Sequence, residues 1–445
     1  MDSFSLLSHP TAAPTGLAIL LVLLALIYRT STRTKAASLP ADSQAPKSST
    51  KSVESKGSGW LTVAPDGREW GRWIPSDFRM PPIPADHDFD LNTTQPPMYR
   101  AWKYKHTVVM DAKNMPWEKW IELDNQFPRY HALRKARIAE RGKRLYGVLP
   151  GAEDAAREIL LELSEFLSQR YPSVYKVTRR SGTQGSWFGE PNEICRIQIP
   201  ALQADYDFDE IDDAMLIAGL IQPADLAIMM EGEDSLYYMK GGCIALAGSW
   251  RYEDKIGRDL YYIHTTGHVP EYREKLDLPM TRYHQRLRPE TPGWRNNYTL
   301  TVDKGQDELA WSTSTNGPED IYDQSAKGPN RDRLTEEFVL PERITDPTQV
   351  NVRQERQTLR RMPRTGAVLF TVHSYAEPVM AIASEPGVPG RLASAVKSWK
   401  GEVDTHKNGA LYKDLLVPYL EELHKKQVAE GLAVDGVDPE WKYPY

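Results

Sequence analysis

Cysteine is scarce in this 445-residue chain, which contains only Cys195 and Cys243. Two cysteines this far apart cannot build a disulfide framework, a cysteine-based zinc site or an iron–sulfur cluster from this chain alone. A chain with so few cysteines fits a reducing compartment.

The sequence also lacks the patterns that bind nucleic acids and nucleotides. Its 55 Lys and Arg residues are outnumbered by 61 Asp and Glu residues, and no long basic block offsets the net charge of -6, which argues against a nucleic-acid partner. The glycine clusters that begin at Gly182 and Gly241 do not have the G-x-G-x-x-G spacing, and no P-loop motif is present. A reductant such as NADPH would therefore have to act through another protein.

Charged residues are almost absent from the N-terminus, where Asp2 is the only one before Arg29. Residues 12–28 form an uncharged, mostly apolar run of 17 residues, which is the short end of what spans a bilayer. Arg29, Arg33 and Lys35 follow it directly. The run predicts a single membrane anchor in residues 1–30, and the positive-inside rule puts the rest of the chain in the cytosol. We expect the membrane to be that of the endoplasmic reticulum. A signal peptide would instead need a basic start and a small-residue cleavage site.

The remaining sequence predicts a tether and one α+β domain with a mainly antiparallel sheet. Residues 31–59 are rich in Ser, Thr, Ala, Lys and Pro and read as a flexible linker. Residues 60–445 form the domain, in which the Phe127-Pro128 step is expected to break any helix. We expect a polar surface excursion over 303–349, helices over 151–171 and 411–423, and strands over 194–202, 236–247, 260–264, 297–302 and 367–375.

An acidic run, Asp205-Tyr206-Asp207-Phe208-Asp209-Glu210, raises the question of a metal site. It lacks the glycine of a calcium loop, and Leu216 stands where the terminal glutamate belongs. A D-x-D site of a lumenal glycosyltransferase is an alternative, but it needs the opposite membrane topology. The simpler interpretation is the solvated start of a helix.

Two histidines, His264 and His268, stand in the segment I-H-T-T-G-H-V-P. His264 ends an apolar run, and a neutral imidazole that faces an apolar pocket is what a haem iron needs as its axial ligand. His268 is the alternative ligand. Gly267 and Pro270 argue against a helix here, and an arbitrary histidine more often has a structural role.

Residues 352–375 combine an arginine-rich stretch with a run of strand formers. The guanidinium groups suit an anion such as a haem propionate or a phosphate, and Arg356 and Arg360 are the expected contacts. The alternative is a solvated helix coated by these side chains. The arginines concerned are Arg353, Arg356, Arg360, Arg361 and Arg364.

The segment E-R-Q-T-L-R-R-M-P-R-T-G-A-V-L-F-T-V-H-S-Y, residues 355–375, resembles the signature of the haem-dependent oxidative N-demethylase α-subunit family. Shorter pieces agree in order, among them Y-G-V-L-P-G from Tyr146, R-Y-P from Arg170, I-H at His264 and R-N-N-Y from Arg295. The resemblance covers about residues 60–380. It implies a PAS-like haem-binding fold and an oxygen-activating monooxygenase that receives electrons from a separate reductase.

The resemblance also implies roles for single residues. His264 matches the position of the proximal iron ligand, and Trp250, Arg356 and Arg360 are expected to contact haem b. Asp225 and Tyr298 are the expected catalytic residues, although Tyr298 replaces a tryptophan of the family and the expected acidic pair appears only as Ala224-Asp225.

The expected activity is hydroxylation or oxidative N-dealkylation of a small organic substrate, as a tailoring step of specialised metabolism. Electrons would come from an external NAD(P)H-dependent reductase. The alternatives are a haem sensor without turnover and the lumenal glycosyltransferase. A P450 is excluded, because neither Cys195 nor Cys243 stands in the cysteine loop that such enzymes need.

Overall fold

The computed structural model describes residues 64–182, 192–211, 213–246, 250–302, 322–323, 328–329 and 343–437, and residues 61–445 form one compact unit. The predicted anchor and linker lie outside the described residues, as does most of the predicted surface excursion over 303–349. Among the residues that are described, no helix is long and apolar enough to cross a membrane.

A seven-stranded sheet is the centre of the domain, with strand order β1-β8-β11-β12-β6-β7-β2. All pairings between the described strands are antiparallel, so the predicted α+β class with an antiparallel sheet is confirmed. A second sheet has the order β3-β4-β5, and β9 pairs with β10. The strands are β1 (Lys113–Asn114), β2 (Tyr146–Val148), β3 (Lys176–Arg179), β4 (Ile194–Ile199), β5 (Ala204–Asp207), β6 (Asp225–Glu231), β7 (Tyr237–Cys243), β8 (Gly293–Val302), β9 (Tyr322–Asp323), β10 (Gly328–Pro329), β11 (Val350–Arg361) and β12 (Val368–Pro378).

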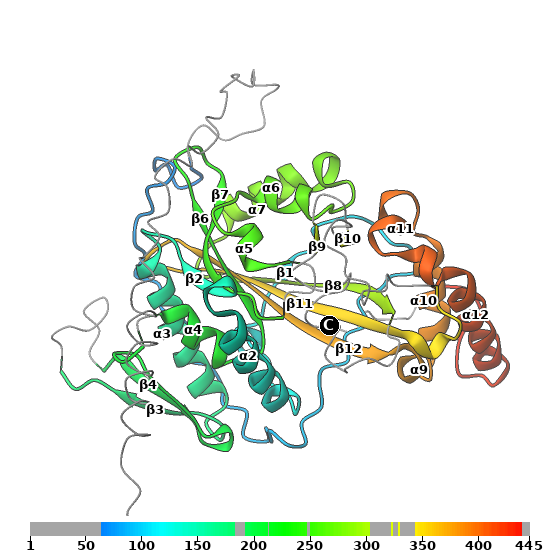
Figure 1. Ribbon diagram of the computed structural model, residues 1–445, viewed down its shortest axis with the longest axis horizontal. Coiled ribbons are helices and arrows are strands. Elements are labelled where there is room, and N and C mark those ends of the chain that lie inside the picture. Colours follow the sequence, from blue (N-terminus) through cyan, green and yellow to red (C-terminus); the bar gives the residue numbers. More distant parts are fainter. Residues whose placement is uncertain are drawn as a thin grey trace, which may run out of the picture. The chain divides into compact units, whose positions relative to one another are not determined.

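Helices cover both faces of the large sheet (Figure 1). One face carries α2 (Phe127–Arg141), α3 (Glu153–Arg170) and α4 (Ala214–Leu220). The other carries α5 (Tyr252–Lys255), α6 (Leu260–Thr266) and α7 (Asp277–Arg286). A C-terminal group lies at the far end of β8, β11 and β12 and consists of α9 (Val379–Ile382), α10 (Val388–Lys397), α11 (Glu402–His406) and α12 (Lys413–Ala429).

One of two helix predictions is confirmed and the other is wrong. The helix predicted over 151–171 is α3, whose apolar side is buried in the core between the sheet and α4. At Phe127-Pro128 the prediction of a helix break is wrong, because α2 begins at Phe127 and Pro128 lies in its first turn. The backbone N–H that proline lacks has no intrahelical partner in a first turn, so proline costs little there.

The strand predicted over 260–264 is wrong, because these residues form α6. The aromatic residues favour a strand by propensity, but Asp259 caps a helix by accepting a hydrogen bond from the N–H of Tyr262 at 2.7 Å. Leu260 and Ile263 are buried one turn apart, whereas Tyr261 and Tyr262 are exposed. Burial on one helical face therefore overrides local propensity.

The arginine-rich segment forms β11, an interior strand of the large sheet between β8 and β12, and not a solvated helix. Because side chains alternate along a strand, Arg356 and Arg360 point to the α3 face. Arg353, Glu355 and Gln357 point to the α6 and α7 face, where they border a cavity. The segment is strongly charged and yet buried, so each guanidinium needs a partner inside the protein.

The turn between β11 and β12 fastens the sheet to α3. The backbone N–H groups of Arg364 and Thr365 donate to the Glu158 carboxylate at 2.8 and 2.9 Å. Gly366 has φ +71°, and a Cβ there would lie 2.3 Å from the Trp73 ring. The R-T-G part of the motif is thus explained by a helix contact and a tight approach that only glycine permits.

The acidic run 205–210 is a strand and a turn, so the predicted helix start is wrong. Arg196 donates to both oxygens of Asp205, at 2.6 and 2.7 Å, and its Nη1 lies 4.0 Å from Asp207. Two of these carboxylates are therefore neutralised by an arginine of the neighbouring strand β4.

A buried ion pair ties α2 to the edge of β6. Arg134 Nη1 lies 2.6 Å from Asp225 Oδ1, and the arginine side chain is fully buried. The same carboxylate accepts hydrogen bonds from the backbone N–H groups of Ala245 and Leu246. Asp225 therefore holds the chain that follows β7.

Removal of Asp225 should destabilise the protein strongly. Asp225→Ala leaves the Arg134 charge buried without a carboxylate, so we expect a loss of about 3–5 kcal/mol in the free energy of unfolding. Urea unfolding followed by circular dichroism measures this loss. The matched control is Asp414→Ala, which breaks the exposed pair between Arg343 and Asp414 and should cost less than about 1 kcal/mol. Equal losses in the two variants would refute the assignment.

Buried His373 should make stability depend on pH. Burial lowers the pKa of His373 to about 3, below the unfolded value near 6.5. The unfolded chain then binds the extra proton, so stability is complete above about pH 6.5 and falls as the pH drops toward 3. His373→Gln should reduce this slope between pH 6.5 and 4 by up to about 1.4 kcal/mol per pH unit. Urea unfolding at several pH values tests this, with exposed His87→Gln as control; an unchanged slope in His373→Gln contradicts it.

Candidate functional site

A cavity of about 470 Å³ lies between the large sheet and the helices α6, α7 and α11. Its volume is within the range of about 300–1,000 Å³ that is usual for small-molecule and cofactor sites. Side chains of β6, β8, β11 and β12 form its floor, and α6 and α7 close it from the other side.

The cavity lining divides into an apolar part and a polar part. Apolar side chains come from β6, β7, α6 and α7, and they belong to a buried cluster with Met229, Met239, Leu260, Ile263 and Met280. Polar side chains gather on β8 and β11 and near α11. They include Arg295, Asn297, Thr299, Thr301, Arg353, Glu355, Gln357 and Lys407. The site thus suits an amphipathic molecule with an apolar body and a polar edge.

His264 borders the cavity from α6. Its Nδ1 lies 2.7 Å from the Leu260 carbonyl oxygen, so Nδ1 carries the proton in the neutral ring and donates it there. Burial lowers the pKa of His264 to about 4, which keeps the imidazole neutral at pH 7. The Nε2 lone pair is then left to bind a metal. The Tyr272 ring stacks on the imidazole at 4.8 Å and an interplanar angle of 8°, which fixes the ring orientation.

A second histidine, His284 on α7, has the same arrangement. Its Nδ1 lies 2.9 Å from the Met280 carbonyl oxygen, burial lowers its pKa to about 4, and it borders the same cavity. The local sequence pattern around His284 does not differ from that of an ordinary helix, so this residue could not be recognised as a site residue from the sequence. His268, the alternative ligand, follows α6 with φ 51° and does not border the cavity.

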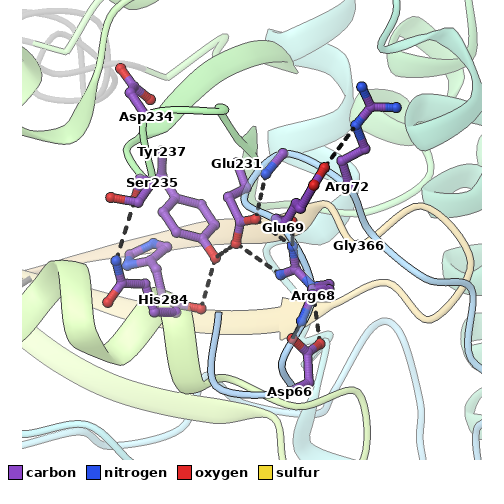
Figure 2. A network of polar contacts seen from close by, with 12 residues as sticks. Asp66, Arg68, Glu69, Arg72, Glu231, Asp234, Ser235, Tyr237, His284 and Gly366 are labelled. Carbon is purple, nitrogen blue, oxygen red and sulfur yellow. Dashed lines mark hydrogen bonds and ion pairs between the residues drawn. The ribbon is translucent and has the colours of Figure 1, made fainter. Parts of the chain in front are cut away.

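A network of polar side chains contacts the backbone of α7 at the carbonyl oxygen of His284 (Figure 2). Figure 2 shows Glu231 between Arg68 and Tyr237, with Arg68 Nη2 at 2.9 Å and the Tyr237 hydroxyl at 2.8 Å from Glu231 Oε2. The Tyr237 hydroxyl also lies 3.2 Å from the His284 carbonyl oxygen. Arg361 donates to the same tyrosine hydroxyl at 2.7 Å. The network therefore connects β6, β7 and β11 to the helix that carries His284.

Trp250, which the sequence analysis predicts to contact the cofactor, borders the cavity beside His264. The Lys255 ammonium lies 4.6 Å from the Trp250 ring centroid, and burial lowers the pKa of Lys255 to about 8. A Cβ on Gly267 would lie 2.8 Å from the Trp250 ring. Glycine at the end of α6 is thus what allows the tryptophan to pack against the histidine helix.

Tyr298 borders the polar part of the cavity from β8 and is buried among aromatic rings. Its hydroxyl oxygen is buried and has no hydrogen-bond partner among the described residues. Burial raises the pKa of Tyr298, so the phenol stays protonated at pH 7. Lys407 donates to the Tyr298 carbonyl oxygen and lies 4.5 Å from its ring centroid. Tyr298 can therefore offer a hydrogen bond to a bound molecule.

The other predicted catalytic residue, Asp225, also borders the cavity, but its carboxylate is engaged by Arg134 and two backbone N–H groups. In a proton-transfer role Asp225 would become protonated, and the fully buried Arg134 would then lose the negative charge that pairs with it. The geometry therefore favours a positioning role for Asp225 in the cavity wall.

The two arginines predicted to bind an anion lie on the opposite face of the sheet from the cavity. Arg356 is paired with Glu122 at 3.0 Å, and Arg360 is paired with Glu162 at 2.5 Å. Arg360 also lies 4.2 Å from the Trp120 ring centroid. The structure brings neither of them to the cavity, because a strand sends alternate side chains to opposite faces.

Arg295 and Arg353 instead supply the guanidinium groups of the cavity. Arg353 Nε lies 3.3 Å from Glu355 Oε1, and Arg295 is opposite Gln357 in the register of β8 and β11. In the sequence, Arg295 could be noticed only because it begins the R-N-N-Y piece of the family resemblance.

The described residues of this site do not form a metal site built from several protein side chains. Within the described parts of the chain, no group of three or more His, Cys, Asp or Glu side chains is placed to hold a metal ion. A neutral histidine that faces the cavity, such as His264 or His284, fits a metal that is held mainly by its own macrocycle.

The chain matches the model of a known protein family. The model of the family described as haem-dependent oxidative N-demethylase, alpha subunit-like, matches residues 111–417 of the 445 residues. The matched region contains His264, His284, Arg295 and the whole of β11 and β12. The chain therefore belongs to the haem-dependent oxidative N-demethylase alpha-subunit-like family.

Proposed function

We propose that this protein is a haem-dependent oxidoreductase that hydroxylates or oxidatively N-demethylates a small organic substrate. The observation that carries the proposal is His264, a neutral, oriented imidazole that borders an amphipathic cavity. Family membership supports haem dependence and an oxidative demethylation chemistry. The proposed setting is a tailoring step of specialised metabolism.

The cavity residues fit haem b in three respects. The apolar part of the lining suits the faces of the macrocycle, and the polar part on β8 and β11 suits its propionate edge. His264 would ligate the iron, and Trp250 would contact the macrocycle. Bound haem would supply an iron centre for the reductive activation of dioxygen.

Protein side chains around the cavity would bind and orient the substrate. The buried Tyr298 hydroxyl has a proton to donate and no protein acceptor among the described residues, so it is the proposed hydrogen-bond donor to the substrate. Asp225 would keep the cavity wall in place through Arg134. The electrons would come from a separate NAD(P)H-dependent reductase, because the sequence lacks a dinucleotide motif of its own.

The antiparallel sheet with helices on both faces is compatible with a PAS-like haem domain, which we propose as the fold type. We also propose that residues 1–30 anchor the protein in the endoplasmic reticulum membrane with the domain in the cytosol. The uncharged run before Arg29, Arg33 and Lys35 supports this orientation.

His264 should be required for haem ligation. In purified protein reconstituted with haemin, His264→Ala should lose the histidine-ligated Soret band, weaken haem binding by about tenfold or more, and recover the band when imidazole is added. His268→Ala is the matched control and should be unchanged. If only His284→Ala loses the band, the iron ligand is His284 on α7 and not His264.

Two further outcomes of this experiment decide between functions. A wild-type protein without a Soret band would refute the haem proposal. A normal Soret band without oxygen uptake in the presence of a reductase and candidate amines would favour a haem sensor.

Deletion of residues 1–59 should release the protein from membranes. We expect the full chain in the carbonate-resistant membrane fraction and the deletion variant in the supernatant. A cytosolic domain also predicts no glycan at the Asn92 and Asn297 sequons. A glycosidase-sensitive mass shift that is lost in Asn92→Gln would place the domain in the lumen.

A further inference from the structure

Arg295 is a partly buried arginine of the cavity lining. It borders the cavity from β8, and its Nε atom is buried without a hydrogen-bond partner among the described residues. The described residues also provide no carboxylate at ion-pair distance from it. Burial lowers the pKa of Arg295, because its charge is only partly offset by Glu355 and Asp111 farther away.

Three of the buried arginines each have a carboxylate partner. Arg134 is paired with Asp225 at 2.6 Å, Arg356 with Glu122 at 3.0 Å and Arg360 with Glu162 at 2.5 Å. A buried charge that is left unpaired destabilises the folded protein. Arg295 has no such partner among the described residues, so its partly buried charge is not expected to stabilise the fold.

The carboxylates that border the cavity are already engaged. Glu355 lies 3.3 Å from Arg353 Nε and accepts hydrogen bonds from the side chains of Asn297 and Gln357. Asp225 is paired with Arg134. The positive charge of Arg295 is thus presented to whatever fills the cavity.

A second cation lies at the same polar end. Lys407 on the cavity lining is buried, donates to a backbone carbonyl, and has no carboxylate at ion-pair distance among the described residues. Arg295 and Lys407 together give this end of the cavity a positive potential, which is strong because the surroundings are poorly hydrated.

We propose that Arg295 is the carboxylate-binding residue of the cavity, and that the bound molecule is an apolar ligand with a carboxylate at its edge. The carboxylate belongs either to a haem propionate or to an acidic substrate. A guanidinium suits this role, because its parallel N–H groups match the two oxygens of a carboxylate. The propionate source rests on the proposed haem function, whereas the substrate source does not.

The first test compares stability with ligand affinity in Arg295→Gln. Without ligand, the variant should be at least as stable as wild type in urea, because it removes an unpaired buried charge. Arg286→Gln, an exposed site on α7, is the control with the same change of charge. Lower stability of Arg295→Gln than of Arg286→Gln would show a structural role and overturn the proposal.

The second test uses iron-free protoporphyrin IX and its dimethyl ester, which lacks free carboxylates, titrated by fluorescence. If Arg295 binds a propionate, Arg295→Gln weakens protoporphyrin binding by about ten- to a hundredfold, and the two proteins bind the ester equally. Arg295→Lys should give an intermediate loss. Because no iron is involved, this result does not depend on His264 or on the Soret experiment.

The third test uses benzoate and benzamide in thermal-shift measurements, with and without haem. If Arg295 binds a substrate carboxylate, benzoate raises the melting temperature of wild type but not that of Arg295→Gln. Benzamide, which has no carboxylate, has the same effect on both proteins, and both bind protoporphyrin with equal affinity. If Arg295→Gln matches wild type for both protoporphyrin and benzoate, the proposal is wrong.

Discussion

The charge buried along β11 is the constraint on which much of this structure depends. β11 carries arginines on both faces, so each guanidinium requires a carboxylate or a carbonyl oxygen as its partner. An unpaired buried charge would destabilise the fold by more than most single contacts stabilise it. On one face, Glu122 and Glu162 meet this requirement for Arg356 and Arg360, and this places α3 and the segment before α2 against the sheet. Arg361 meets it on the other face with the backbone carbonyl oxygens of Leu287 and Gly366.

The same strand supplies both a core and a cavity floor because its side chains alternate. The face toward α3 is filled by paired charges and tryptophan rings, among them Trp117 and Trp120 around Arg360. The opposite face is only partly filled, so Glu355 and Gln357 border open space. A strand with a charged sequence can therefore serve a ligand site without a long loop, and the rigid sheet holds the polar groups in place.

The sequence was informative where local and tertiary forces agree. The helix α3 and the strand β12 follow from apolar periodicity. The β11 residues were recognised as important, but their conformation and the partners of Arg356 could not be derived, because cross-sheet carboxylates such as Glu122 are more than two hundred positions away. His264 was predicted on a strand but lies on a helix capped by Asp259. His284 and Arg295 were not singled out as site residues, because only the fold brings them to one cavity.

The segment before the family-matched region has a consequence for where the folding unit begins. The family match starts at residue 111, yet Arg68 donates both Nη groups to Glu231, and Phe89 and Trp102 are buried in two different core clusters. A fragment cut at the family boundary would expose both clusters and leave the Glu231 carboxylate without its guanidinium. The evolutionary unit and the physical unit of this protein therefore have different N-terminal limits, and the physical one extends at least to the residues around Arg68.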